Sequence, residues 1–142
     1  LVKGLMREIG PLLNLDAVDE MNDAPHWRLA FDELYGMDAV LDEERGLLVL
    51  IASVPAPEHL DKEALYRKTL THNHGWPTSG RARAGLRGDA IVLTEEITTE
   101  GLDLSRLSGR VTALTTALKA FMADLPSSDA DLTDIAQNYT RV

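Results

Sequence analysis

The chain has 142 residues, of which 44% are hydrophobic, and this size and composition predict a single globular domain. Its 14 Lys and Arg residues against 23 Asp and Glu residues give a net charge of -9, which repels nucleic-acid phosphates and anionic lipid surfaces. Because the chain also lacks Cys and any apolar stretch near the roughly 20 residues of a membrane span, we expect a soluble cytosolic protein that binds neither nucleic acid nor membranes.

The first predicted element is a short helix. Apolar side chains recur at mostly three- and four-residue steps, at Val2, Leu5, Met6, Ile9, Leu12 and Leu13. Pro11 is expected to kink or end this helix near its last turn. Residues 14–25 then become acidic and contain turn-forming residues, so we expect a linker or a loose loop there.

Three antiparallel strands are expected next. Residues 27–32 and 37–41 alternate apolar with other side chains, which is the period of a half-buried strand. A turn at residues 42–46 leads into residues 47–54, an uncharged run of mostly branched side chains that ends at Pro55. Because both faces of this run are apolar, it is predicted to be an inner strand covered on both sides.

The second half of the sequence predicts a helix, two strands and a final helix, at residues 59–73, 80–86, 90–97 and 104–125. The last helix has the clearest pattern, because seven apolar residues follow a strict three-four alternation and Asp103 can cap its first turn. Pro126 ends it, and residues 127–142 form a polar tail with only a weak helical pattern.

The expected architecture is an α+β domain over residues 1–126, with the order α-β-β-β-α-β-β-α and a five-stranded, mainly antiparallel sheet. The first and last helices carry the longest apolar stripes and are expected to cover one sheet face. The middle helix alone is then expected to cover the other face, but its apolar side is narrow, while Tyr66 and Trp76 add large apolar surface nearby. We therefore predict that a second copy of the chain buries this side in a symmetric dimer.

Catalytic and metal-binding motifs are weak. His72 and His74 flank the end of the middle helix and would point apart, so we expect no metal site there. The alternative hypothesis, a metal-dependent hydrolase, is supported by the histidines alone. Ser79 lacks the setting of a nucleophile elbow, and no glycine cluster matches a phosphate loop, so we expect neither an enzyme nor a cofactor. Residues 81–87 carry three arginines, which either receive an acidic partner segment or form a solvated strand face.

Several segments together resemble the class I type III secretion chaperones, the CesT-like or Tir chaperone family. The similarity to the first hairpin of that family lies in the sequence Leu-Ala-Phe-Asp-Glu at residues 29–33, in Gly36 and in the alternating Met37, Ala39 and Leu41. Later segments are similar in the spacing of Leu65, Leu70 and Asn73 and in residues 85–93. The resemblance consists of many weak positions in the right order.

This resemblance implies a homodimeric, ATP-independent chaperone of the bacterial cytoplasm that keeps the non-globular amino-terminal segment of a secreted effector soluble and competent for secretion. An extended segment of this kind can add to a sheet edge and place alternate side chains in shallow pockets. The alternative is a cytosolic regulatory protein that sequesters a secretion-apparatus or transcription component through the same surface.

The resemblance also implies where the partners bind, around the first helix and the first strands for the effector and on the middle helix for the second copy. The candidates for effector binding are Leu12, Leu13, Leu29, Phe31, Met37 and Leu41. The candidates for the dimer interface are Leu65, Tyr66, Leu70 and Trp76. These apolar residues are also the expected hydrophobic core, and for each of them the core is the favoured interpretation, by roughly three to one.

Overall fold

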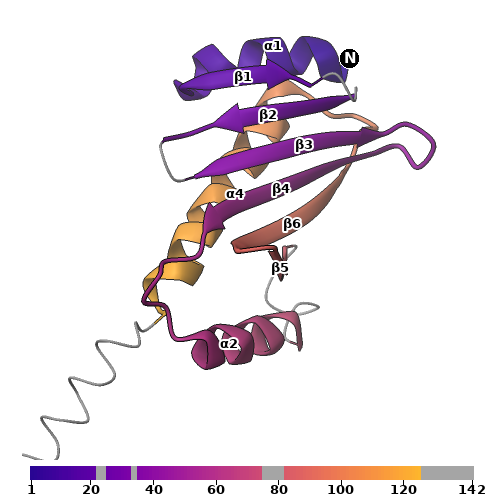
Figure 1. Cartoon of the computed structure of the whole chain (residues 1–142). Helices are drawn as coiled ribbons and strands as arrows, with labels where there is room; N and C mark the ends of the chain where they lie inside the picture. The colour runs from indigo at the N-terminus through magenta and orange to yellow at the C-terminus, as the bar shows by residue number, and fades with distance from the viewer. Residues whose placement is uncertain (22–24, 33–34, 75–81, 126–142) are drawn as a thin grey trace, which may run out of the picture.

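The chain folds around a six-stranded antiparallel sheet (Figure 1). The structure is a computed structural model, which describes residues 1–21, 25–32, 35–74 and 82–125. In their order across the sheet, the strands are β1 (Ala17–Glu20), β2 (His26–Ala30), β3 (Gly36–Asp42), β4 (Leu47–Pro55), β6 (Ala90–Thr98) and β5 (Arg83–Arg87). The α+β class and the antiparallel sheet are confirmed, and the sheet has one strand more than the sequence predicts.

Of the three helices that the structure describes, two cover one face of the sheet. α1 (Val2–Leu13) and α4 (Leu104–Ala123) contact each other, and α4 also contacts β4 and β6 (Figure 1). α2 (Lys62–His74) lies beyond the other end of the sheet, where it packs beside β5. The expectation that the middle helix covers the second sheet face is therefore wrong, because its main contacts are with an edge strand.

Burial in β4 follows the two-residue period of a strand. Leu48, Leu50, Ala52 and Val54 are buried on the side of α4, whereas Leu47, Val49, Ile51 and Ser53 are only partly buried on the other side. β4 is an inner strand as predicted, between β3 and β6, but within the described residues helices cover only one of its faces. The core therefore lies between the sheet and the two helices α1 and α4.

β1 lies in the acidic stretch that the sequence predicts to be a linker. Asn14 ends α1 with a left-handed backbone (φ 53°), which reverses the chain so that β1 runs back along the helix. Gly10 allows this close approach, because a Cβ at that position would lie 3.1 Å from Cγ2 of Val18. Tertiary contacts therefore make a strand of a segment whose composition by itself predicts a loop.

A buried ion pair fixes α4 on the sheet. Glu95 of β6 points toward the helix layer and is only 2% exposed. Arg110 of α4 donates from Nε to Oε2 of Glu95 at 2.9 Å and from Nη2 to Oε1. This hydrogen bonding with Glu95 raises the pKa of Arg110, so the guanidinium keeps its charge next to the buried carboxylate.

Across the described ranges, no helix is both long and apolar enough to span a membrane.

Candidate functional site

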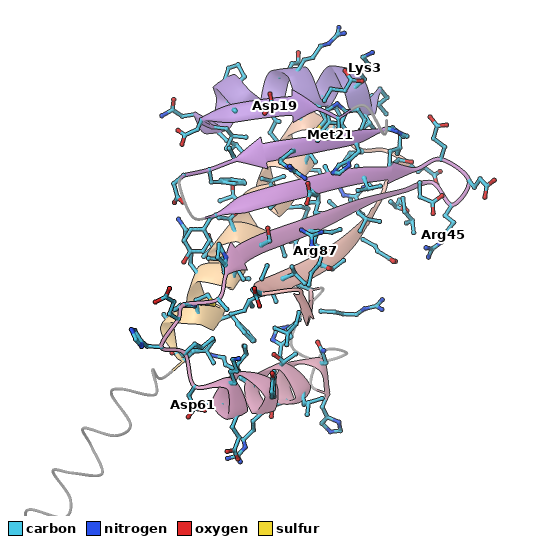
Figure 2. All side chains as sticks on the ribbon, viewed as in Figure 1. Lys3, Asp19, Met21, Arg45, Asp61 and Arg87 are labelled. Atoms are coloured by element: carbon cyan, nitrogen blue, oxygen red, sulfur yellow. The ribbon has the colours of Figure 1, made fainter. Side chains whose placement is uncertain are left out.

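A groove with a volume of about 550 Å³ lies between α1 and the first two strands. We call it the α1–β1 groove. It is lined by Lys3, Met6, Arg7, Gly10, Pro11, Asn14, Leu15, Val18, Glu20 and Trp27. Figure 1 shows α1 and β1 side by side at one end of the sheet, and Figure 2 labels Lys3 and Asp19 on these two elements.

The floor of the groove is apolar. Met6 and Trp27 are buried in the hydrophobic core, and Leu15 and Val18 are partly buried against it. A partner side chain that enters the groove would therefore contact surface that is continuous with the core. Burial of one aliphatic or aromatic side chain there contributes about 1.5 to 3 kcal/mol.

The rim of the groove carries charge of both signs. Lys3 and Arg7 are exposed on α1, and Nζ of Lys3 lies 3.7 Å from Oε1 of Glu20, which is a weak surface ion pair. Within the described residues, the Arg7 guanidinium has neither an ion-pair partner nor a hydrogen-bond partner. The groove thus presents one cation that no described residue neutralises.

The groove also lies beside an open sheet edge, because among the described strands β1 pairs only with β2. The Met21 N–H donates to the His26 carbonyl at 2.8 Å, in the same register as the rest of the β1–β2 pair. Main-chain groups alternate in direction along an antiparallel strand, so those of Asp19 face β2 and those of Val18 and Glu20 face outward. An extended segment can hydrogen bond to these outward-facing groups.

The opposite sheet edge, at β5, is occupied by a side chain of α2. Nδ2 of Asn73 donates to the Ala84 carbonyl at 2.8 Å, and Oδ1 of Asn73 accepts from the Ala84 N–H at 2.8 Å. Nε2 of His72 lies 2.9 Å from the Ala82 carbonyl oxygen. The outward-facing main-chain groups of Ala84 and the carbonyl of Ala82 are therefore already paired, so this part of the β5 edge is closed to an added strand.

The sheet face opposite α1 and α4 carries a buried carboxylate with three cationic or imidazole partners. Asp38 accepts at Oδ1 from His26 Nε2 at 3.0 Å and Arg28 Nε at 3.2 Å, and at Oδ2 from Arg87 Nη2 at 3.2 Å. Burial by itself would raise the pKa of Asp38, but these hydrogen bonds outweigh burial and hold the pKa below its ordinary value. Arg87, which lies over the sheet in Figure 2, is thus engaged within its own chain.

The six residues proposed for effector binding lie in different environments, and none of them lines the α1–β1 groove. Leu29 and Met37 are fully buried in the core, and Leu13, Phe31 and Leu41 are partly buried against it. Leu12 is 54% exposed near the end of α1. Effector binding through these six residues stays a prediction, and Leu12 is the most accessible of them.

Sequence reasoning missed several residues of the groove, above all Arg7 and Val18. One signal was available, because positions 3, 7, 10 and 14 follow the helical repeat and therefore share one flank of α1. A flank formed by Lys3, Arg7, Gly10 and Asn14 is polar and small. The neighbouring flank of α1 carries the apolar stripe, which predicts packing in the core.

The four residues proposed for the dimer interface are also divided. Leu65 is buried inside the chain, whereas Tyr66 is 50% exposed and Leu70 is 71% exposed on α2. Leu86 of the adjacent β5 is a further exposed large apolar residue. Trp76 lies outside the described residues. The exposed members are spaced as neighbours on one helix face.

The histidines have structural partners at two positions. His26 bonds to Asp38 and His72 bonds to the Ala82 carbonyl. In the part of the chain that the structure describes, no group of three His, Cys, Asp or Glu residues lies close enough to hold a metal ion.

The sequence matches no protein-family model and no curated protein sequence. Three solved structures of low sequence identity nevertheless share its fold. A chain of the ExsC–ExsE complex aligns with a TM-score of 0.75 and 23% identity over 88% of this chain and 93% of its own. A chain of the Yersinia pestis type III secretion chaperone SycH with a stable fragment of YscM2 aligns with a TM-score of 0.59 and 20% identity over 83% and 97%.

The third structure is the HopA1–SchA chaperone–effector complex, one chain of which aligns with a TM-score of 0.63 and 16% identity over 84% of this chain and 91% of its own. The chain therefore has the fold of the class I type III secretion chaperones, as the sequence resemblance implies.

Proposed function

We propose that the protein is a type III secretion chaperone, which binds the non-globular amino-terminal segment of a secreted effector and keeps it soluble and competent for secretion. The observation that carries this proposal is the α1–β1 groove, where an apolar floor lies directly beside an unpaired sheet edge. These are the two features that an extended segment needs, since the edge supplies main-chain hydrogen bonds and the floor accepts alternate side chains.

The neighbouring structures support the same function. SchA was solved in a chaperone–effector complex with HopA1, and the chaperone SycH was solved with a fragment of YscM2. Both complexes contain chains of this fold together with a protein partner. A role in holding a partner polypeptide therefore fits this chain better than an enzymatic role.

We further propose that two copies of the chain form the working unit through α2. Tyr66 and Leu70 leave large apolar surface on a helix whose other side packs beside β5. A symmetric contact between two such helices would bury these side chains on both copies. The dimer would leave both α1–β1 grooves free, because α1 lies at the opposite end of the sheet from α2 (Figure 1).

Co-expression tests the proposal. The full chain is produced with amino-terminal fragments of type III effectors from the same bacterium, and complexes are isolated by size-exclusion chromatography with light scattering. We expect a stable complex of two chains of this protein with one effector fragment. Mass spectrometry of partners captured from the native bacterium separates this function from the regulatory alternative, which would yield a secretion-apparatus or transcription component.

A Pro substitution tests the groove itself. Val18→Pro removes an N–H that faces outward from β1, so pairing with β2 should persist while strand addition is blocked. Val18→Thr is the matched control, because it keeps the N–H and nearly the same shape. If Val18→Pro bound effector fragments as well as the wild type does, the groove would not be the binding site.

A further inference from the structure

We propose that the α1–β1 groove selects an extended partner segment that carries an acidic side chain, which pairs with Arg7. This inference depends on the proposed function, and it names the chemistry of the segment that the groove accepts. The central observation is that Arg7 lines the groove and has no partner within the described residues.

Arg7 stands above the path that an added strand would take. β1 runs back along α1, so that Gly10 meets Val18 near one end of the groove and Lys3 meets Glu20 near the other. Arg7 lies between Lys3 and Gly10 on the same flank of α1. A strand added to the outer edge of β1 would therefore pass beneath Arg7, with every second side chain on the helix side.

The other arginines of the surface show that Arg7 is unusual. Arg67 pairs with Glu63 at 3.1 Å, and Arg45 lies 3.9 Å from Asp42 and 3.8 Å from Glu96. In a chain of net charge -9, carboxylates are abundant, yet none of the described ones pairs with Arg7.

Docking of a partner strand would remove water from Arg7. The neighbouring floor is apolar, so a segment with only apolar or basic side chains would leave the guanidinium partly desolvated and without an anion. A segment with an Asp or Glu at the facing position supplies that anion and forms a charge-assisted hydrogen bond. Specificity then arises both from attraction of the acidic segment and from rejection of the others.

Peptide selection tests this inference. A phage-displayed library of random twelve-residue peptides is selected against the full chain, against Arg7→Gln and Arg7→Glu, and against Arg67→Gln as a control on α2. We expect wild-type selection to enrich Asp or Glu about three- to fivefold at one position, in phase with alternating apolar residues. Arg7→Gln should lose this preference, Arg7→Glu should replace it with Lys or Arg, and Arg67→Gln should keep it.

The net charge of the protein distinguishes local recognition by Arg7 from long-range electrostatic attraction. Long-range attraction to a chain of net charge -9 favours basic peptides, so acidic enrichment at one position requires local recognition. Peptides that alternate correctly but show no acidic preference, or a preference that persists in Arg7→Gln, would overturn the inference and leave the proposed function intact. If Val18→Pro selected the same peptides as the wild type, the groove would not be the binding site and both would be contradicted.

Discussion

The side-chain amide of Asn73 pairs with the main chain of Ala84 in both directions, with two hydrogen bonds of 2.8 Å. A helix residue thus takes the place of a neighbouring strand at the β5 edge. Among the described residues the β1 edge has no such cap, since β1 pairs with β2 alone and the main-chain groups of Val18 and Glu20 face outward. Unpaired edges invite uncontrolled strand pairing, so capping one edge restricts addition to the other.

Replacing Asn73 by Leu should therefore both destabilise the protein and promote self-association. The loss of two hydrogen bonds at a surface site should lower the free energy of unfolding by about 1 to 2 kcal/mol. Urea unfolding measures the first effect, and sedimentation velocity over a range of concentrations measures the second. Thr71→Ala, on the same helix, is the control, and equal behaviour of the two variants would show that Asn73 does not cap the edge.

The stability contributed by Asp38 should depend on pH. Its native pKa lies below the ordinary value of 3.8, so the unfolded state binds more protons as the pH falls through that range. Its contribution is therefore present above about pH 4 and is lost below it. We expect Asp38→Asn to lower the free energy of unfolding by about 1 to 2 kcal/mol at pH 7.

Urea unfolding at pH 7 and at pH 3 tests this behaviour. The difference between the wild type and Asp38→Asn should shrink at pH 3, whereas the exposed control Asp19→Asn should change little at either pH. A difference of equal size at both pH values would mean that the hydrogen bonds from His26, Arg28 and Arg87 do not favour the charged carboxylate.

The two partners of the buried ion pair should differ in their cost of removal. Arg110→Met leaves the carboxylate of Glu95 buried without a partner and should lower the free energy of unfolding by about 3 to 5 kcal/mol. Glu95→Leu should cost less, because Arg110 is partly exposed and can reach water. The double variant Glu95→Leu with Arg110→Met should recover much of the loss. A double-mutant cycle by chemical unfolding measures the coupling, and additive losses would contradict it.

The proposed dimer predicts a specific effect of charge on α2. Leu70→Glu should weaken dimerisation at least about tenfold, because it places an unpaired charge in an apolar contact. The fold of each copy should be unaffected, since Leu70 is 71% exposed within the chain. Sedimentation equilibrium measures the dissociation constant, with Leu12→Glu on α1 as the control. A wild-type protein that is monomeric, or a Leu70→Glu variant that dimerises normally, would rule out this interface.

The sequence predicted a helix or strand correctly where its buried side chains recur with the period of that element. The three-four alternation of α4 and the uncharged run of β4 each reflect a face that must be buried whatever its partner. The resemblance to type III secretion chaperones likewise indicated the correct fold. The predicted effector-binding residues are less accessible than a binding role requires. The sequence does not distinguish an apolar side chain of the core, such as Leu29, from one that lines a groove.

The sequence by itself determined the fold class and the order of all elements except β1, because those elements follow from periodic burial along the chain. Only the tertiary structure decided that the acidic segment Ala17–Glu20 is a strand, that Asn73 caps β5, and that Arg87 reaches Asp38 across the sheet. These features depend on contacts between separate segments of the chain, such as that between Asp38 and Arg87, which are 49 positions apart, and no local period encodes such contacts. The α1–β1 groove belongs to this second group, because it exists only where α1 and β1 come together.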